Sequence, residues 1–446
     1  MTRFTLFPLL LVFIASSLRA EDAEFARQKL DNWHQWRGPL ANGTAPHGKP
    51  RVKWDGQTNI KWKTELPGLG SATPIVWGDL VFVLTALDTG REAEPADIPK
   101  PDPRFEKITK PPTTYHQFIV LAIDRNTGAV RWKHVAAELV PHEGHHPTHS
   151  YAAYSPTTDG TFLYVSFGSP GLFCYDFNGK LQWKRTDLPR LETRLGWGEG
   201  GSVVVHGDSL IVSRDQEGPS FLYVLDKRSG ETRWKVQRDE VTTWNTPLVV
   251  DHKGRTQVIV LGTKFIRSYD LADGRPLWQC GGLTINCIPS ALRYDDSVIC
   301  MSGYRGAAAF CISLDAVGDV TGSDKILWSY KRGTPYVPSP LLSGDLLYFT
   351  QSNDPLLTCL NAKTGAVIFD RERLRALTSL YASPVEAGGR IYITDREGTT
   401  MVLQRGEKMK ELSVNRLGEP IDASPAVVGK QLFLRGAKHL YCIEGE

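Results

Sequence analysis

The sequence has no hydrophobic run long enough to cross a membrane, and it has no large excess of either charge. Its 52 Lys and Arg residues nearly balance 49 Asp and Glu residues, for a formal net charge of +3 at pH 7. That balance argues against nucleic-acid binding through bulk charge. The sequence also lacks a Gly-x-Ser-x-Gly elbow and a phosphate-binding loop ending in Gly-Lys-Ser/Thr. A hydrolase that uses two carboxylates stays open, because the fold brings such pairs together without a fixed spacing in sequence.

No two cysteines are adjacent, and none form a Cys-x-x-Cys pair or a haem signature. An odd number of cysteines in an oxidising compartment leaves at least one free or paired between chains. Most of them stand in apolar strand sequence such as Val298-Ile-Cys300, so we predict buried free thiols, with a Cys280–Cys287 disulfide as the alternative. The seven are Cys174, Cys280, Cys287, Cys300, Cys311, Cys359 and Cys442.

The N-terminus predicts a signal peptide over residues 1–20. Arg3 precedes an apolar stretch, and Ser16-Ser-Leu-Arg-Ala20 supplies small residues for cleavage after Ala20. The apolar core is too short for a membrane span, so we expect no transmembrane segment after cleavage. The first cysteine is Cys174, so no lipid anchor is expected at the cleavage site. We therefore predict a soluble bacterial protein that is periplasmic or secreted.

A Ser or Thr recurs at the head of an apolar run eight times along the chain. After the first interval the copies are 41 to 49 residues apart, and each unit contains short strands and turns. A period of about 40 to 50 residues is that of a four-stranded propeller blade. The eight residues are Thr73, Ser155, Ser202, Thr246, Ser290, Ser339, Ser383 and Ser424.

The second half of each unit repeats an Asp or Asn, a Gly-containing turn and an aromatic residue four positions after the Gly. The side-chain oxygen can accept backbone N–H groups two residues on, and Gly supplies the positive φ that closes a hairpin. An indole on the outgoing strand can pack on the neighbouring blade while its N–H finds a partner, so we interpret the tryptophans as packing residues. The repeat residues are Asp124, Gly128 and Trp132; Asp176, Gly179 and Trp183; Asp226, Gly230 and Trp234; Asp270, Gly274 and Trp278; Trp328; and Gly365.

The two ends of the chain complete one blade between them. The last unit stops at Ile443 before any turn or Trp, while an unassigned strand with Trp62 precedes the first unit. Supplying the outer strand of the last blade from the N-terminal side leaves no open sheet edge. The fold class predicted is all-β: an eight-bladed β-propeller over residues 59–443, with four antiparallel strands per blade and the last blade closed by an N-terminal strand.

One of these turns carries a family resemblance. Leu121-Ala-Ile-Asp-Arg-Asn-Thr-Gly-Ala-Val-Arg-Trp132 resembles the blade signature of the pyrrolo-quinoline quinone (PQQ)-like β-propeller repeat family, and the units at Leu225-Asp226 and Tyr269-Asp270 are similar to it. The resemblance covers residues 59–443 and implies the propeller architecture. That family contains quinone-dependent dehydrogenases, outer-membrane assembly lipoproteins and many secreted proteins, so the resemblance is specific for fold and not for activity.

Three segments depart from the repeat. Residues 21–58 form an N-terminal extension with Asn32-Trp-His-Gln-Trp-Arg-Gly-Pro39, which we expect to pack across one mouth or side of the propeller. A Pro-rich insert at 88–114 predicts an extended, solvated loop. A His-rich loop at 141–151 lies between blades one and two and is expected to pass over a face toward the central channel. It is interpreted as a polar connection, with a metal site as the alternative; its candidate ligands are His142, His145, His146 and His149.

Residues just upstream of the repeated Ser and Thr are expected to surround the central channel. They combine aromatic, amide and acidic side chains, which either fill and hydrate a narrow axis or bind a planar polar cofactor or a sugar. The predicted residues are Glu199, Trp244, Asn245, Asn286, Tyr336, Tyr381 and Asp422.

The resemblance leaves two functions open. In the family's catalytic branch a vicinal Cys-Cys disulfide lies against the quinone, Glu, Asn and Asp hold Ca²⁺, and an Asp acts as base; none of this set matches a position here. The leading hypothesis is a non-catalytic binding or scaffolding propeller of the bacterial envelope or secreted space, which holds an envelope protein or an extended polymer and not nucleic acid. The alternative is a PQQ-dependent oxidoreductase with Ca²⁺ that acts on alcohols or sugars.

Overall fold

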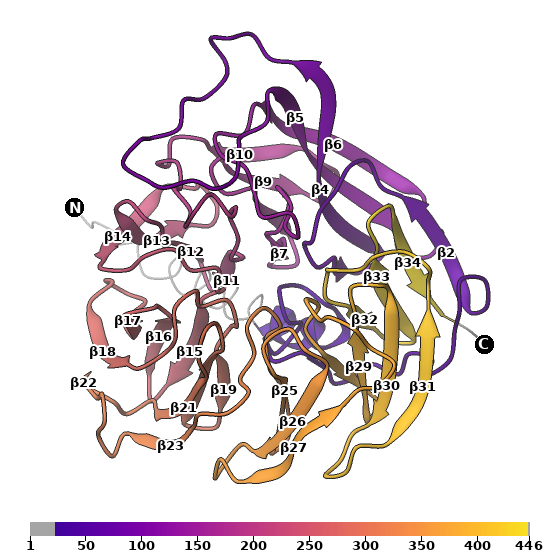
Figure 1. Ribbon diagram of the computed structural model, residues 1–446. Coiled ribbons are helices and arrows are strands. Elements are labelled where there is room, and N and C mark those ends of the chain that lie inside the picture. Colours follow the sequence, from indigo (N-terminus) through magenta and orange to yellow (C-terminus); the bar gives the residue numbers. More distant parts are fainter. Residues whose placement is uncertain (1–22, 445–446) are drawn as a thin grey trace, which may run out of the picture.

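The strands form eight sheets arranged in a ring around a central axis (Figure 1). The structure is a computed structural model that describes residues 23–444. The predicted signal peptide, residues 1–20, lies outside the described residues. Within them, no helix has the length and apolar character that a membrane span requires.

Each blade is a meander of four antiparallel strands, and two blades carry a short parallel fifth strand. The first four blades are β3 (Ile75–Trp77), β4 (Leu80–Glu92), β5 (Thr114–Asp124) and β6 (Val130–Leu139); β7 (Thr157–Thr158), β8 (Phe162–Ser166), β9 (Leu172–Asp176) and β10 (Leu181–Arg185); β11 (Val204–His206), β12 (Ser209–Arg214), β13 (Ser220–Asp226) and β14 (Thr232–Arg238); and β15 (Leu248–His252), β16 (Arg255–Val260), β17 (Phe265–Asp270) and β18 (Pro276–Gly281), with β22 (Gly318–Asp319) added outside.

The other four blades follow in chain order. They are β19 (Leu292–Tyr294), β20 (Ser297–Ser302), β21 (Ala308–Ser313) and β23 (Ile326–Tyr330); β24 (Leu341–Ser343), β25 (Leu346–Thr350), β26 (Leu356–Asn361) and β27 (Val367–Arg373); β28 (Val385–Ala387), β29 (Arg390–Thr394), β30 (Thr399–Gln404) and β31 (Glu411–Arg416), with β1 (Thr44–Ala45) added inside; and β32 (Ala426–Val428), β33 (Gln431–Arg435), β34 (His439–Ile443) and β2 (Ile60–Glu65). The predicted eight blades of four strands are confirmed.

The ring closes where the two ends of the chain meet. The N-terminal strand β2 pairs antiparallel with β34, with Trp62 opposite Cys442, and so becomes the outer strand of the eighth blade. The inner strands β3 and β32 contact each other across the same seam. The prediction that an N-terminal strand completes the last blade is therefore confirmed.

The repeated turns hold neighbouring blades together through their tryptophans. In the first blade, Asp124 Oδ1 accepts the backbone N–H groups of Asn126 and Thr127 at 2.9 and 2.8 Å, and Gly128 adopts a φ of 76°. Trp62 of the preceding blade donates its indole N–H to the Arg125 carbonyl at 2.8 Å, and a Cβ on Gly128 would lie 2.8 Å from that indole ring. Glycine is therefore required both by the turn and by the close approach of the indole. Trp132, Trp183, Trp234 and Trp328 donate to the next blade in the same way.

Trp278 differs from the other tryptophans of the repeat. Its indole N–H donates to Gln257 Oε1 within its own blade at 3.0 Å. The next blade has no Asp-x-x-x-Gly turn at the matching position, because its third strand leads instead into the excursion that contains β22. The Trp278 indole therefore bonds within its own blade, because the next blade lacks the turn whose backbone carbonyl accepts the indole N–H elsewhere in the ring.

The repeated Ser and Thr residues form a hydrogen-bonded ring around the axis. In six of the eight steps the hydroxyl of one blade accepts the backbone N–H of the corresponding residue in the preceding blade, at 2.8 to 3.0 Å. These bonds form two runs, from Thr73 to Thr246 and from Ser290 to Ser424. The ring is interrupted at Ser290, whose hydroxyl accepts the indole N–H of Trp36 at 2.9 Å, and at Thr73, whose buried hydroxyl has no hydrogen-bond partner in the structure. These short polar side chains satisfy backbone donors that the converging inner strands would otherwise bury unpaired.

All seven cysteines are buried and unpaired, including Cys280 and Cys287. Burial raises the pKa of the Cys280 thiol to about 11. The predicted free thiols are present, and the alternative disulfide is not formed. Their thiolate fraction at neutral pH is small, so we assign them to packing between strands.

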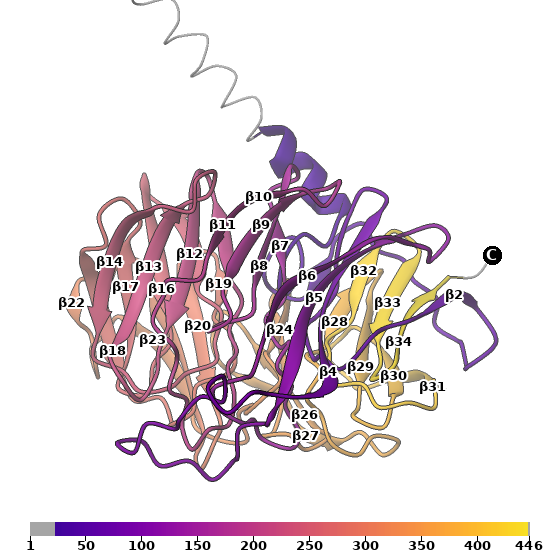
Figure 2. The ribbon, with the colours of Figure 1, turned by 90° about the horizontal axis from the view of Figure 1, so that it is seen from above.

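The ring has two unlike faces. The hairpin face carries the connections between the first and second strands of each blade and is crossed by the N-terminal extension, which contains η1 (Lys29–Asp31). The loop face carries the blade-to-blade connections, the His-rich loop and the insert. Figure 2 shows the N-terminal segment at one face and the insert between β4 and β5 at the other. The strand pair β4–β5 continues to Glu92 and Thr114, so the part of the insert outside these strands is residues 93–113.

Candidate functional site

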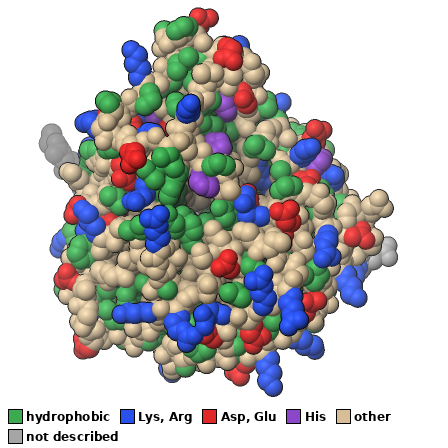
Figure 3. All heavy atoms as spheres, viewed as in Figure 1, with side chains coloured by type: hydrophobic (Ala, Val, Ile, Leu, Met, Phe, Trp, Pro, Cys, Tyr) green, Lys and Arg blue, Asp and Glu red, His purple; other side chains and the backbone are tan. Residues whose placement is uncertain are grey.

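A pocket of about 330 Å³ lies on the propeller axis and opens toward the loop face. Figure 3 shows histidine and hydrophobic side chains around a hollow near the centre of this face. The part nearer the hairpin face is surrounded by the Ser/Thr ring, including Ser155, Ser202 and Ser424. The upper part, nearer the loop face, is surrounded by side chains of the blade-to-blade loops and by Tyr304 of the β20–β21 loop. The upper residues are His146, Thr148, His149, Trp197, Trp244, Tyr304, Tyr336, Tyr381 and Asp422.

The N-terminal extension closes the pocket on the hairpin face. Trp36 lines both the axial pocket and a groove on the opposite face, so its indole separates the two. Arg37, beside it, is 1% exposed and donates from its two terminal nitrogens to the carbonyls of Pro340 and Pro384, both at 2.8 Å. Burial lowers the pKa of Arg37 to about 9. The extension thus makes the channel a blind pocket.

One wall of the pocket is an aromatic belt, which we define as Trp244, Trp197, Tyr304 and Tyr336. Successive ring centroids are 6.5, 6.4 and 4.7 Å apart. The four rings come from four different connections, and the Trp244 indole is fixed by donating to the Gly198 carbonyl at 2.7 Å. Burial raises the pKa of Tyr336 to about 12, so its hydroxyl stays protonated at neutral pH. The belt offers flat apolar faces together with phenol hydroxyls.

The opposite wall is polar. Thr148 lies within hydrogen-bond distance of both His146 Nδ1, at 2.7 Å, and the Tyr381 hydroxyl, at 2.8 Å. Asp422 accepts two bonds from Arg396, at 2.7 and 3.3 Å, and the Arg396 guanidinium lies 4.3 Å from the centroid of the Tyr381 ring. Asp422 and Arg396 form an ion pair with no net charge, so this wall presents hydrogen-bond donors and acceptors without net charge.

The structure brings four of the seven predicted channel residues together. Trp244, Tyr336, Tyr381 and Asp422 line the axial pocket. Asn245 is instead buried and exchanges hydrogen bonds with the backbone of Leu261. Asn286 is 2% exposed with a φ of 58° and is not among the residues that line the pocket. Glu199 points into a neighbouring cavity of about 300 Å³ between the insert and the His-rich loop.

Three Trp and Tyr residues of the pocket, Trp36, Trp197 and Tyr304, were not among the channel residues predicted from sequence, and neither was Thr148. Trp197 precedes Gly198 and Gly200-Gly201 in the connection between the second and third blades. A Trp in a glycine-rich loop was the one sequence feature that could have indicated a pocket residue here. Tyr304 follows the second strand of its blade, a position outside the repeat that defined the channel set. Trp36 comes from the extension, and nothing in its local sequence indicates which part of the ring it reaches.

The four histidines of the His-rich loop point in different directions. His145 Nδ1 pairs with the His146 carbonyl at 2.8 Å, and His149 Nε2 with the Glu199 carbonyl at 2.8 Å. Burial lowers the pKa of His149 to about 4 and also lowers that of His146, so both are neutral at pH 7. His146 and His149 therefore belong to the axial pocket, whereas His142 turns toward the neighbouring cavity.

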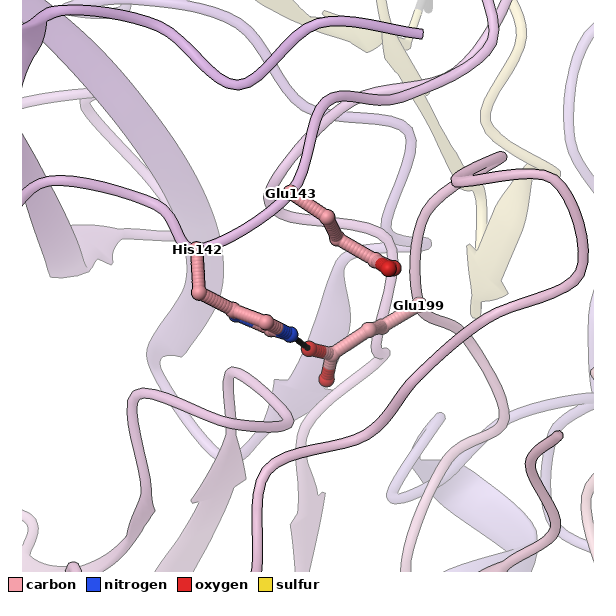
Figure 4. A group of neighbouring side chains, drawn as sticks. All are labelled: His142, Glu143 and Glu199. Atoms are coloured by element: carbon pink, nitrogen blue, oxygen red, sulfur yellow. Dashed lines mark ion pairs between the residues drawn. The ribbon is translucent and has the colours of Figure 1, made fainter. Parts of the chain in front are cut away.

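His142, Glu143 and Glu199 lie together, as Figure 4 shows, with candidate ligand atoms within 4.8 Å of one another. Each side chain already has partners. His142 Nε2 lies 2.7 Å from the Leu191 carbonyl, to which it donates, and 4.0 Å from Glu199 Oε1. Glu143 accepts a 2.6 Å bond from Lys107 of the insert as well as bonds from Thr193. The trio therefore ties the His-rich loop to the insert and to the next connection, and metal binding at the His-rich loop stays a prediction.

The buried carboxyl of Glu199 should make the stability of the folded protein depend on pH. Its carboxyl accepts the Ser169 N–H at 2.7 Å, and burial raises its pKa above the ordinary value of 4.5. The folded state therefore binds this proton more tightly than the unfolded state does, so the stabilisation is present below pH 4.5 and is lost as the pH rises through the raised pKa. We expect the unfolding free energy of wild type, minus that of Glu199→Gln, to fall between pH 4 and pH 8 in urea titrations.

Glu138 is the control for that experiment. A hydrogen bond from Gln117 lowers the pKa of the Glu138 carboxyl, so the corresponding difference for Glu138→Gln should change with pH in the opposite direction. A wild-type minus Glu199→Gln difference that does not change with pH would contradict the assignment of a raised pKa to Glu199.

Comparison with known proteins identifies the family. The family model of the outer membrane protein assembly factor BamB matches residues 116–371, more than half of the chain. The chain belongs to this PQQ-like β-propeller family. No curated protein sequence matches it.

Similar solved structures include both kinds of propeller. BamB from Moraxella catarrhalis is 15% identical, with a TM-score of 0.52 over 81% of this chain and 100% of that one. Quinohemoprotein alcohol dehydrogenase from Comamonas testosteroni is 10% identical, with a TM-score of 0.64 over 97% of this chain and 84% of that one. The computationally designed Ika8 protein is 10% identical, with a TM-score of 0.55 over 85% of this chain and 99% of that one. At these identities the likeness shows the fold alone.

The pocket residues do not fit PQQ with Ca²⁺. Calcium takes about six to eight oxygen ligands, usually including several carboxylates. Asp422 is the one carboxylate among the residues that line the axial pocket, and both of its oxygens already accept bonds from Arg396. No cysteine lines the pocket, and no two are adjacent in the sequence. We therefore derive no quinone chemistry from this site.

Proposed function

We propose that this chain is a non-catalytic binding propeller of the bacterial cell envelope, exported and without a membrane span, which holds a partner protein or an extended polymer at its loop face. The observation that carries the proposal is the blind axial pocket, with an aromatic belt on one wall and a neutral polar wall opposite. Concave sites with apolar walls and a few convergent polar groups are typical of binding sites. The family is that of an outer membrane protein assembly factor, which supports an envelope role.

The polar side chains support binding rather than catalysis. Burial lowers the pKa values of the pocket histidines, His146 and His149. The single carboxylate of the pocket, Asp422, is paired with Arg396. A general acid or base works best with a pKa near the operating pH and free access to the substrate. The trio of His142, Glu143 and Glu199 is similarly occupied by Leu191, Lys107 and Ser169. These groups are suited to orienting a bound molecule.

The proposal is tested by capture from a bacterial envelope extract. We expect immobilised residues 21–446 to retain a reproducible component, and Trp197→Ala combined with Tyr336→Ala to lose it, because an aromatic contact in a binding pocket contributes about 1 kcal/mol or more per ring. Tyr294→Ala is the matched control, since Tyr294 lies at the end of β19 outside the pocket and bonds to Asp345. Equal capture by the wild type and the double variant would refute the pocket as the binding site.

Calorimetry distinguishes the alternative function, a PQQ-dependent oxidoreductase, from the binding propeller. Titration of the same protein with PQQ and Ca²⁺ should give no saturable heat, because the pocket lacks the oxygen ligands that Ca²⁺ requires. Saturable binding of one equivalent would instead support the oxidoreductase and direct the search to alcohol and sugar substrates.

A further inference from the structure

The aromatic belt consists of two ring pairs, and the Trp197 and Tyr304 rings that join the pairs stand at 83° to each other. Trp197 and Trp244 are inclined by 27° with centroids 6.5 Å apart, and Tyr304 and Tyr336 by 31° with centroids 4.7 Å apart. Neither pair is spaced for a flat ring to insert between its members, because stacking on both sides needs about 7 Å between ring planes, twice the optimal carbon–carbon contact distance. Each pair therefore offers a surface on which a ligand ring can lie with one face.

The charge of the pocket argues against ionic ligands. Asp422 is the only Asp, Glu, Lys or Arg among the lining residues, and it is neutralised by Arg396. His146 and His149 stay neutral at pH 7. An anionic cofactor, a phosphate or a phospholipid headgroup would thus lose its hydration without gaining an unpaired cation, which is unfavourable in a half-buried site. The ligand that fits is uncharged.

The polar wall is suited to hydroxyl groups. Asp422 can accept further bonds, and Thr148 and Tyr381 can each donate and accept. A hydroxyl on a ligand can donate to the carboxylate while it accepts from a neighbouring donor. Neighbouring hydroxyls on one ring would satisfy several of these groups together.

A sugar ring meets both requirements. A pyranose has a face of C–H groups, whose partial positive charge is attracted to the negative face of an aromatic ring, and a rim of hydroxyls. The floor formed by Trp36 and the Ser/Thr ring blocks passage through the propeller, so a polymer can enter only by its end. The volume of about 330 Å³ is at the small end of ligand pockets, as expected for a short terminal segment.

We propose that the axial pocket binds the terminal sugar units of an uncharged glycan, stacked on the aromatic belt with their hydroxyls directed to Asp422, Thr148 and Tyr381. This inference rests on the proposed function and names its ligand class. The glycan end enters from the loop face and stops at Trp36.

The experiment measures binding of neutral trisaccharides to the protein, residues 21–446, by saturation-transfer NMR and calorimetry. The probes are maltotriose, cellotriose, mannotriose and tri-N-acetylchitotriose, with trigalacturonate as the acidic comparison. We expect at least one neutral trisaccharide to bind, its affinity to fall about tenfold or more in Trp197→Ala and in Asp422→Asn, and trigalacturonate to bind more weakly. Tyr294→Ala should keep the wild-type affinity, and thermal melts establish that each variant is folded.

The outcomes separate this inference from the proposed function. If none of the neutral trisaccharides binds while the Trp197/Tyr336 double variant still loses its envelope component, the glycan assignment is wrong and the binding propeller stands. Tighter binding of trigalacturonate than of every neutral sugar would also overturn the assignment. If no sugar binds and the double variant captures as well as wild type, both proposals fail.

Discussion

Replacing Trp62 by alanine should lower the free energy of unfolding by about 3–5 kcal/mol, the range for removing a buried large aromatic side chain. Trp62 is 8% exposed and stands on β2, the strand that closes the ring. Its indole packs on Gly128 of the first blade and lies 5.9 Å from the Phe433 ring, and its N–H donates to the Arg125 carbonyl. The substitution removes contacts on both sides of the seam and leaves that carbonyl without its donor.

Trp197→Ala is the matched control for this prediction. Trp197 lies in the pocket wall, is more exposed than Trp62 and belongs to a loop rather than a strand. Its loss should change the unfolding free energy by about 1 kcal/mol or less, as is usual outside the core. Urea unfolding followed by both circular dichroism and fluorescence measures the two effects and tests whether the transition is two-state. Equal destabilisation by the two substitutions would contradict the role of Trp62 in closure.

Replacing Asp215 by alanine should be comparably destabilising, by about 3–5 kcal/mol, because it leaves a buried charge without its partner. The side chains of Asp215 and Arg238 are both 0% exposed, and two bonds of 2.7 and 3.1 Å join them. Asp215 also accepts the Thr243 hydroxyl at 3.0 Å, while Arg238 donates to the Tyr269 hydroxyl. This network connects the third and fourth blades, so its loss should loosen their contact.

Two further variants test the electrostatic explanation. Arg185 and Asp187 form a similar pair at 2.6 Å, but the Asp187 side chain is 66% exposed, so Asp187→Ala should cost about 1 kcal/mol or less. Combining Asp215→Ala with Arg238→Met should recover much of the lost stability, because the unpaired charge is removed together with its partner. If the double variant is as unstable as the sum of its single variants, lost packing rather than an unpaired charge explains the effect.

The architecture could be predicted from the sequence because its chemistry is local and repeated. An Asp or Asn oxygen three or four residues before a Gly fixes the turn in most blades, as at Asp124 and Gly128, and the indole that follows has one neighbour on which to pack. Trp278 shows the limit of that rule, because its partner depends on a turn in the next blade. The eighth blade followed from counting strands, since Trp62 had no other blade to complete.

The site was only partly predictable because it is built from loops. Trp244, Tyr336, Tyr381 and Asp422 each precede an inner strand, and the geometry of the ring brings them to one place. Asn245, in contrast, turns back to bond with the Leu261 backbone, a choice made by tertiary contacts.

The directions of the four histidine side chains were also not predictable, because these residues lie in a loop. A run of four histidines over eight residues suggests convergence, but without a helix to align them each imidazole takes the nearest carbonyl or hydroxyl. His142 therefore bonds to Leu191, and His149 to the Glu199 carbonyl. Sequence proximity in a loop does not determine which way the side chains point.

In the proposed function, the loop face around the axial pocket makes the functional contact. The most direct measurement is photo-crosslinking in the producing cells with benzoylphenylalanine placed at Tyr304 in the pocket, at Leu181 on the outer strand β10, or at Leu40 on the N-terminal extension, where Leu181 and Leu40 are 43% and 47% exposed. We predict a discrete adduct from position 304 and none from positions 181 or 40. An adduct from position 181 or 40 without one from position 304 would place the contact on a blade edge or on the hairpin face and would contradict the claim.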